Sequence, residues 1–296
     1  MGLPLESVPN FSEGRDRATI DALASALGVH AELLDVHADA DHNRSVFTLV
    51  GDGDELVAAL LAGMATARER IDLRRHEGAH PRIGAADVVP IVPLAKGDMP
   101  RARAAAFALA VRAGRELGLP VFCYGELAPG RSPAFFRRGG LEALRQRVQA
   151  GELSPDFGPA ELDASAGAVL VGARGPLVAF NVNLRGASLE IAREIAALVR
   201  ESGGGFRGVR ALGLELRRAG FVQVSMNVED HEASPLRDVL ARIEAEARAR
   251  GAEVAGSELV GLVPAGAALA AAGSALRIAG LDASRVVELR LLGRLR

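Results

Sequence analysis

The sequence predicts an α+β protein built from two ferredoxin-like (βαββαβ) subdomains side by side, with a ligand cleft between them. Its 296 residues correspond to about two domains. Its apolar residues alternate between the period of a strand and the period of a helix. The resulting order β-α-β-β-α-β occurs twice, and that order defines the split βαβ unit. Two such units beside one another leave a cleft, where ligands commonly bind.

In the first copy, Ile20, Leu23 and Leu27 recur at helical spacing, and RSVFTLVG (44–51) alternates like a strand. Two prolines in ADVVPIVPL (86–94) favour an edge strand or a strand end there. The predicted elements are strand 4–10, helix 16–28, strands 31–39 and 44–51, helix 54–72 and strand 86–94, followed by helix 99–117, strand 120–125, helix 133–149 and strand 167–173.

The second copy begins at LVAFNVNL (177–184) and contains a predicted hairpin of GVRALGLEL and GFVQVSMNV. Its elements are strand 177–184, helix 187–202, strands 208–216 and 220–228, helix 234–250 and strand 252–263. The uncharged stretch between Glu258 and Arg277 is interpreted as the end of a strand and a buried helix that begins at Pro264, because Pro and Gly make it a poor membrane span. We expect subdomains at 1–175 and 176–296, joined by the Gly-, Pro- and Ser-rich segment 151–167.

Composition excludes several functions. A net charge of −2 and only 11 aromatic residues argue against a nucleic-acid partner. All basic residues except Lys96 are arginine, which reflects either an Arg-rich genome or guanidinium groups that bind carboxylates. The single cysteine, Cys123, permits no disulfide framework and no cysteine zinc site. The N-terminus lacks a signal-peptide pattern, so we expect a cytoplasmic protein without a membrane partner.

Three polar clusters are candidates for chemistry. VPNFSEGRD (8–16) is a strand-to-helix turn that could present free N–H groups to an anion, or a helix start capped by Ser12 or Asn10. HADADHNR (37–44) is either a metal-binding cluster or a solvated Asx-rich turn.

The third cluster, residues 74–87, contains HEGAH, which matches the zinc-protease pattern H-E-x-x-H. That pattern requires a continuous helix, whereas Gly78 interrupts it and Pro81 disfavours helical backbone at His80. A third ligand is also missing, so we expect no metal. A rigid loop that carries a histidine for general acid–base catalysis is favoured, with an ordinary surface loop as the alternative.

Taken together, the clusters resemble the formiminotransferase domain of histidine catabolism. The resemblance covers almost the whole chain and includes VPNFSEGRD, DHNRSVFTLVG, RIDLRRHEGAHPRIGAADVVPIVPL, AFNVNL and SELVGLVP. It implies transfer of the formimino group of N-formimino-L-glutamate to N5 of tetrahydrofolate by a homodimer with two ferredoxin-like subdomains. It also implies tetrahydrofolate as co-substrate and no metal. The cyclodeaminase domain of vertebrate relatives is not expected in this chain.

The resemblance places the family's catalytic histidine at His80, which we expect to shuttle the proton with a pKa near neutrality. Its folate-binding stretch falls on 158–167, where Gly158, Pro159 and Gly167 match. His37 stands where vertebrate relatives have an aspartate, so Asp39 or Asp41 is a possible substitute. A carboxylate is expected to hold the imidazole tautomer, with Asp39, Asp41 and Asp87 as candidates.

Ligand carboxylates call for arginine forks, and we nominate Arg44 and Arg82. A phenylalanine such as Phe11 or Phe157 is expected against the pterin. Further candidate binding residues are Asn10, Glu13, His42, Asn43, His76 and Asn183. The alternative functions are a related folate-dependent transferase with another donor, a non-catalytic folate-binding protein, and a zinc hydrolase.

Overall fold

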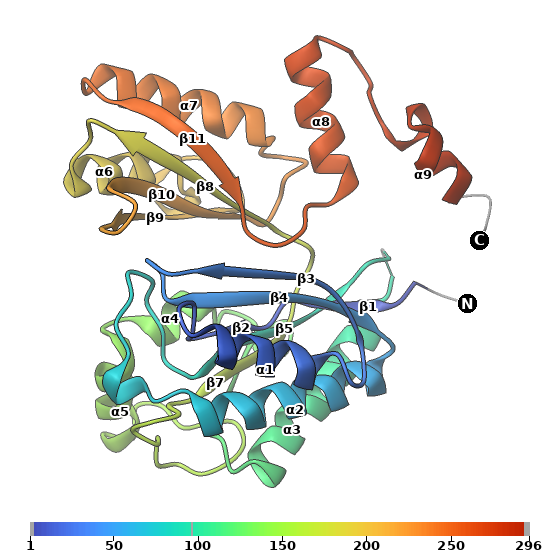
Figure 1. Cartoon of the computed structure of the whole chain (residues 1–296), viewed down its shortest axis with the longest axis vertical. Coiled ribbons are helices and arrows are strands. Elements are labelled where there is room, and N and C mark those ends of the chain that lie inside the picture. Colours follow the sequence, from blue (N-terminus) through green and yellow to red (C-terminus); the bar gives the residue numbers. More distant parts are fainter. Residues whose placement is uncertain (1–2, 96, 293–296) are drawn as a thin grey trace. The chain divides into compact units, whose positions relative to one another are not determined.

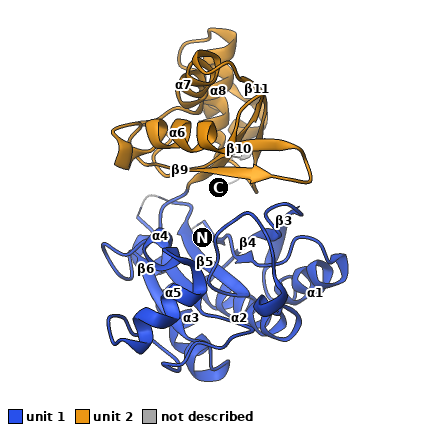
Figure 2. Ribbon diagram, turned by 90° about the vertical axis from the view of Figure 1, so that its left-hand side faces the viewer, with its two compact units in different colours: residues 1–176 blue, residues 177–296 orange. Residues whose placement is uncertain are grey.

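The computed structural model describes residues 3–95 and 97–292, and the chain divides into two compact units, Met1–Pro176 and Leu177–Arg296 (Figures 1 and 2). The elements of unit 1 are β1 (Leu5–Ser7), β2 (Asn10–Phe11), α1 (Arg17–Leu27), β3 (Glu32–Asp39), β4 (Arg44–Gly51), α2 (Gly53–Arg70), η1 (Leu73–Arg75), β5 (Ala86–Pro93), α3 (Met99–Glu116), β6 (Val121–Gly125), α4 (Pro133–Arg137), α5 (Gly140–Gln149) and β7 (Val169–Ala173). The elements of unit 2 are β8 (Val178–Arg185), α6 (Leu189–Val199), η2 (Glu201–Gly203), β9 (Val209–Leu216), β10 (Phe221–Val228), α7 (Leu236–Ala249), β11 (Glu253–Leu259), α8 (Ala265–Leu276), η3 (Ala283–Arg285) and α9 (Val287–Leu292). The α+β class is confirmed.

Unit 1 contains one mixed sheet. β1 and β2 form a single interrupted strand between β4 and β5, β3 pairs with the outer side of β4, and β7 and β6 extend the sheet beyond β5 in parallel. Apolar side chains from α1, α2 and α3 pack on one face, and Figure 1 shows these three helices along it. A second cluster, which includes Phe136 of α4 and Leu144 of α5, covers the other face over β5, β6 and β7. The rest of that second face carries the polar residues described below.

Unit 2 contains a four-stranded antiparallel sheet in the order β11-β8-β10-β9. The helices α6 and α7 contribute Ile195 and Ile243 to a separate apolar core. Four strands of unit 1 follow the corresponding order, because β5, the β1/β2 strand, β4 and β3 lie in the places of β11, β8, β10 and β9.

Several predicted elements have to be corrected. β5 is not an edge strand, since it is buried between β1/β2 and β7, but the alternative of a strand end holds for Pro93, its last residue. Pro90 lies opposite the break between β1 and β2, where a missing N–H costs no ladder bond. Helix 133–149 is two helices, because Gly139 and Gly140 both adopt positive φ. The helix after Pro264 is largely exposed, with only Ala267 and Gly273 buried, because its small side chains cover little area against α7.

The segment 151–167 is not a connection between the units, because it lies inside unit 1 between α5 and β7. Phe157 forms a bridge with Val121 at the start of β6, and Gly167 forms one with Gly84. No described helix is long and apolar enough to cross a membrane.

Candidate active site

The loop between α2 and β5 carries His76, His80 and Arg82. After the short turn η1, residues 76–85 have no regular structure, so HEGAH does not lie on a helix and the zinc-protease interpretation is wrong. Backbone hydrogen bonds hold the loop at both ends, from Ala79 N–H to the Asp41 carbonyl (2.9 Å) and from Ala85 N–H to the Ala166 carbonyl (2.8 Å). These residues form a loop, as predicted, and a histidine of this loop as a general acid–base group stays a prediction.

Arg82 holds this loop in shape. Its guanidinium donates to the carbonyls of His42, Gly78 and His80, and it also contacts the ring of His76. His76 in turn places Nε2 3.0 Å from the Asn43 carbonyl. The donors of Arg82 are therefore engaged within the protein, and binding of a ligand carboxylate by Arg82 or His76 stays a prediction.

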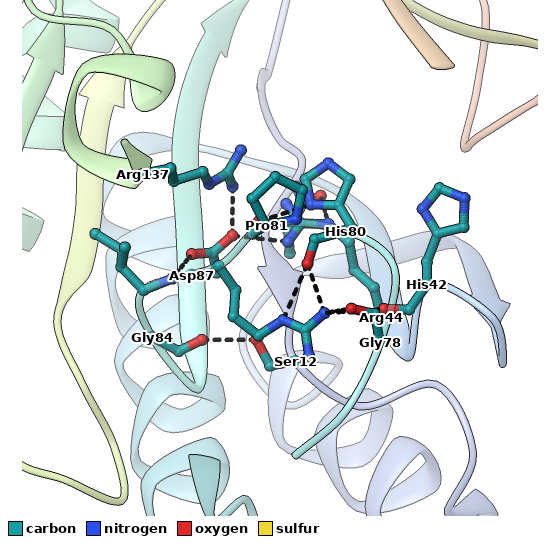
Figure 3. Close-up of polar contacts among 12 residues, drawn as sticks. Ser12, His42, Arg44, Gly78, His80, Pro81, Gly84, Asp87 and Arg137 are labelled. Atoms are coloured by element: carbon teal, nitrogen blue, oxygen red, sulfur yellow. Dashed lines mark hydrogen bonds and ion pairs between the residues drawn. The ribbon is translucent and has the colours of Figure 1, made fainter. Parts of the chain in front are cut away.

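The ring of His80 makes a single hydrogen bond, from Nδ1 to the Pro81 carbonyl oxygen at 2.8 Å (Figure 3). A carbonyl only accepts, so the proton resides on Nδ1 and the lone pair on Nε2. Within residues 3–95 and 97–292, no group hydrogen bonds Nε2. The group that accepts from Nδ1 is thus the backbone carbonyl of Pro81 and not the expected carboxylate of Asp39, Asp41 or Asp87.

The surroundings of His80 favour its neutral form. Burial lowers the pKa of His80 well below its ordinary value, and the positive charges of Arg44 and Arg137 lower it further, with only Asp87 opposing them. The expectation of a pKa near neutrality is therefore wrong. At slightly acidic pH, a larger fraction of His80 is in the neutral form than of a free histidine.

Asp87, at the start of β5, is the carboxylate at the centre of the site. It is fully buried, and its Oδ1 accepts the N–H of Ile83 at 2.9 Å. Its Oδ2 accepts from both Arg44 (2.7 Å) and Arg137, so one carboxylate serves two guanidinium groups. Burial opposes ionisation, but the two arginines outweigh it and lower the pKa of Asp87. Arg137 was missed by sequence reasoning, because no motif or spacing connects α4 with β5.

In the turn after β2, the N–H groups of Ser12, Gly14, Arg15 and Asp16 already have acceptors within the protein, and anion binding by this turn stays a prediction. Glu13 accepts the N–H groups of Arg15 (2.8 Å) and Asp16 (2.9 Å), and Asn43 accepts that of Gly14 (2.9 Å). The cap of α1 is Asp16, rather than Ser12 or Asn10. Ligand binding by Glu13 and Asn43 stays a prediction, although both side chains are used within the protein.

Asn10 lies beside the central ion pairs, where its Oδ1 accepts from Arg44 Nε at 3.0 Å. Phe11, the next residue, is fully buried against Phe47 and has no face available to a pterin, so Phe11 is wrong as that partner and Phe157 stays a prediction. Phe157 packs against Phe107 of α3.

The end of β3 and its turn lie next to the loop of His80. Asp39 Oδ1 accepts the N–H of His42, three residues further on, at 2.6 Å. The turn is not solvated as predicted, because His42 and Asn43 are buried. The pairs His37–Val46 and Asp39–Arg44 are directly opposite in the ladder, so His37 and Asp39 share a sheet face with Arg44. Support of catalysis by His37, Asp39 or Asp41 stays a prediction.

Of the expected folate residues, Gly167 lies against the loop that carries His80. A Cβ on Gly167 would come within 2.1 Å of the Ile83 carbonyl oxygen, so the glycine permits the loop to approach β5. Gly158 and the adjacent Pro159 lie at the start of β6, where Gly158 contacts the Leu119 backbone. Asn183 belongs to unit 2 and accepts from Gln223 at 2.9 Å. These folate contacts stay predictions.

A neutral imidazole with an open nitrogen, placed beside two arginines that share one carboxylate, suits acid–base chemistry on an anionic small molecule. Cys123, by contrast, is buried in β6, and burial raises the pKa of its thiol to about 12. The described residues contain no group of three potential metal-ligating side chains. The two-unit fold and this site define a class of α+β proteins that act on carboxylate-bearing substrates.

Comparison with known proteins gives the particular family. Residues 4–174 match the N-terminal subdomain of the formiminotransferase domain, and residues 179–281 match the formiminotransferase domain. The chain belongs to the formiminotransferase family.

Two relatives cover nearly the whole chain. Glutamate formimidoyltransferase of Streptococcus pyogenes is 41% identical over 98% of this chain and 99% of its own length. That of Thermoplasma acidophilum is 40% identical over 97% of each. The rat formimidoyltransferase-cyclodeaminase is 41% identical over 90% of this chain and 51% of its own length. A microcompartment protein structure from Desulfitobacterium hafniense aligns with a TM-score of only 0.24, which carries no information about this fold.

Proposed function

We propose that this protein transfers the formimino group from N-formimino-L-glutamate to N5 of tetrahydrofolate, giving 5-formiminotetrahydrofolate and glutamate. Family membership and the relatives named glutamate formimidoyltransferase support this reaction. The single structural observation that supports it best is His80, whose Nδ1–H is held by Pro81 while Nε2 is open.

His80 is the general base and then the general acid of the proposed reaction. The N5 lone pair attacks the amidine carbon, and His80 Nε2 removes the N5 proton as the tetrahedral adduct forms. The resulting imidazolium gives this proton to the glutamate nitrogen, and the bond between the amidine carbon and that nitrogen breaks. His80 is then neutral again, so one residue performs both proton transfers.

The ligands carry carboxylates, and the positive groups around His80 are suited to receive one. Burial and the neighbouring Arg137 lower the pKa of Arg44 to about 10, despite the opposing effect of Asp87. Arg44 is only 11% exposed at its side chain, so a bound anion would meet a largely desolvated guanidinium. We therefore include Arg44 among the groups that bind substrate.

We further propose that both units are ferredoxin-like, and that the protein is a cytoplasmic homodimer that binds tetrahydrofolate. The matching strand orders of the two sheets support the first point. A free, buried Cys123 agrees with a reducing compartment. Light scattering of the purified protein tests the dimer, and a mass of one chain would contradict it.

The function is tested by a spectroscopic assay with tetrahydrofolate and two donors, N-formimino-L-glutamate and formiminoglycine. We expect the glutamate donor to be consumed with the higher kcat/KM. Preference for formiminoglycine would favour a related transferase with another donor. Folate binding without transfer from either donor would favour a non-catalytic binding protein.

A further inference from the structure

Arg137 is a largely buried cation that shares its carboxylate partner, Asp87, with Arg44. Its Nη2 donates to Asp87 Oδ2, the oxygen already bound by Arg44, and its side chain is 14% exposed. Its Nε is buried without a hydrogen-bond partner. Among the described residues, Asp87 is its sole partner, and Figure 3 shows the other terminal nitrogen directed away from that carboxylate. A buried cation left partly unsatisfied is costly unless an anion completes its shell.

The position of Arg137 is set by rigid neighbours. Phe136, immediately before it, is fully buried and packs against Phe122 with ring centroids 5.2 Å apart. The helix α4 ends at Arg137, and Gly139 and Gly140 with positive φ turn the chain away behind it. The guanidinium is therefore held at the site in the ligand-free protein, which lowers the entropic cost of binding a ligand there.

The positive charge of Arg137, like that of Arg44, lowers the pKa of His80. In N-formimino-L-glutamate, the α-carboxylate is attached to the same carbon as the nitrogen that leaves. The group that protonates this nitrogen must therefore lie close to that carboxylate. The glutamate carboxylates of tetrahydrofolate, in contrast, are separated from N5 by the length of the aminobenzoyl group.

We propose that Arg137, alongside Arg44, binds the α-carboxylate of the formimino donor. This inference rests on the proposed function and assigns a donor-recognition residue to the same site. The terminal nitrogen of Arg137 that points away from Asp87 donates to the carboxylate, while Asp87 keeps both guanidinium groups in place. A carboxylate at this point also offsets the positive charges near His80, which favours the imidazolium that forms during transfer.

Kinetics of Arg137→Gln, Arg137→Lys and the control Arg138→Gln test this assignment. Arg138 is exposed and adjacent, and makes no hydrogen bond or ion pair with the described residues. We expect Arg137→Gln to raise the KM for N-formimino-L-glutamate at least about tenfold, because it removes a charged hydrogen bond. The lysine variant should be intermediate. The KM of Arg137→Gln for tetrahydrofolate should stay within about twofold of the wild-type value. The same holds for the KM values of Arg138→Gln for the donor and for tetrahydrofolate.

A modified donor provides a second test, and its first part uses only the wild-type protein. Wild-type protein should discriminate at least about tenfold against N-formimino-L-isoglutamine, in which the α-carboxylate is an amide, and Arg137→Gln should lose most of that discrimination. Equal use of both donors by wild type, or a raised KM for tetrahydrofolate instead of the donor, would overturn the assignment.

Calorimetric titration with L-glutamate separates this inference from the proposed reaction. Wild type should bind glutamate, and Arg137→Gln should bind it at least about tenfold more weakly. Equal binding by the two proteins, or none by wild type, would sink the assignment of Arg137. An absence of transfer by wild type that nevertheless binds glutamate through Arg137 would instead refute the proposed reaction.

Discussion

The ring of His42 stacks on the ring of His80, with centroids 5.8 Å apart and planes inclined by 29°. His42 is buried at the tip of the β3–β4 turn, where Asp39 accepts its backbone N–H. The stack and the bond from Nδ1 to Pro81 hold the His80 ring from two directions, so the imidazole is oriented before substrate arrives.

Replacing His42 therefore tests orientation of the catalytic ring. An aromatic pair contributes about 0.5–1.5 kcal/mol, so we expect His42→Ala to lower kcat by about 2- to 12-fold. His42→Phe preserves a stacking partner and should retain most of kcat. If both variants instead raise a KM equally with kcat intact, His42 acts as a ligand-binding residue and not through His80.

Removal of the His80 imidazole should abolish proton transfer at the site. We expect His80→Ala to lower kcat by about 10²–10⁴-fold, the usual contribution of a general acid–base group. Tetrahydrofolate affinity, measured by fluorescence titration, should change little. A His80→Ala protein with wild-type kcat would eliminate the proposed mechanism.

The pH dependence of kcat/KM should reflect the lowered pKa of His80. Because burial and the two arginines favour the neutral imidazole, the base stays active below pH 6.5, and the acidic limb of the profile should lie well below that value. An acidic limb at or above pH 6.5 would contradict this environment. Arg137→Gln removes one of the positive charges and should move the limb upward.

The free energy of unfolding should also depend on the protonation of His80, and it should decrease as the pH falls. The pKa of His80 is lower in the folded state than in the unfolded state, so between these two values the unfolded chain binds more protons. The contribution of His80 is therefore fully present above about pH 6.5 and is lost as pH falls below it. In urea unfolding, wild type should lose stability relative to His80→Gln as the pH falls below about 6.5, and an unchanged difference would contradict this.

Asp87 should be the most sensitive carboxylate of unit 1. Its replacement by asparagine leaves Arg44 and Arg137 without a counter-charge, so we expect a loss of about 3–5 kcal/mol in the free energy of unfolding. Asp21→Asn is the control, because Asp21 pairs with Arg17 on the surface and should cost about 1 kcal/mol or less. Equal losses in the two variants would refute a special role of Asp87.

Gly14 should tolerate no side chain. A Cβ there would lie 2.1 Å from the Asp39 carbonyl oxygen and 2.5 Å from the Arg44 nitrogen, both of which are backbone atoms. Gly14→Ala should therefore lower the free energy of unfolding by about 1–3 kcal/mol. In Gly266→Ala the new methyl group meets open space in α8, so the Tm should be unchanged or slightly higher.

Sequence alone determined the features that depend on local periodicity. RSVFTLVG is observed as β4 with its predicted bounds, and Leu56, Leu60 and Met64 form the buried face of α2 as their spacing required. Gly78 and Pro81 excluded a helix at HEGAH for the same reason, since both act on backbone conformation within a few residues. The assignment of His80 as the catalytic histidine depends on the family resemblance and not on residue spacing.

The tertiary structure determined which residues from distant segments of the chain lie close together. Arg137 is separated from Asp87 by 50 positions, so no local pattern could show that it shares that carboxylate with Arg44. The partner of His80 is a backbone carbonyl, which side-chain composition does not encode. The pKa of His80 follows from burial and from charges contributed by β4 and α4. These properties arise only when separate elements meet, because electrostatic interaction depends on distance in space and on excluded water.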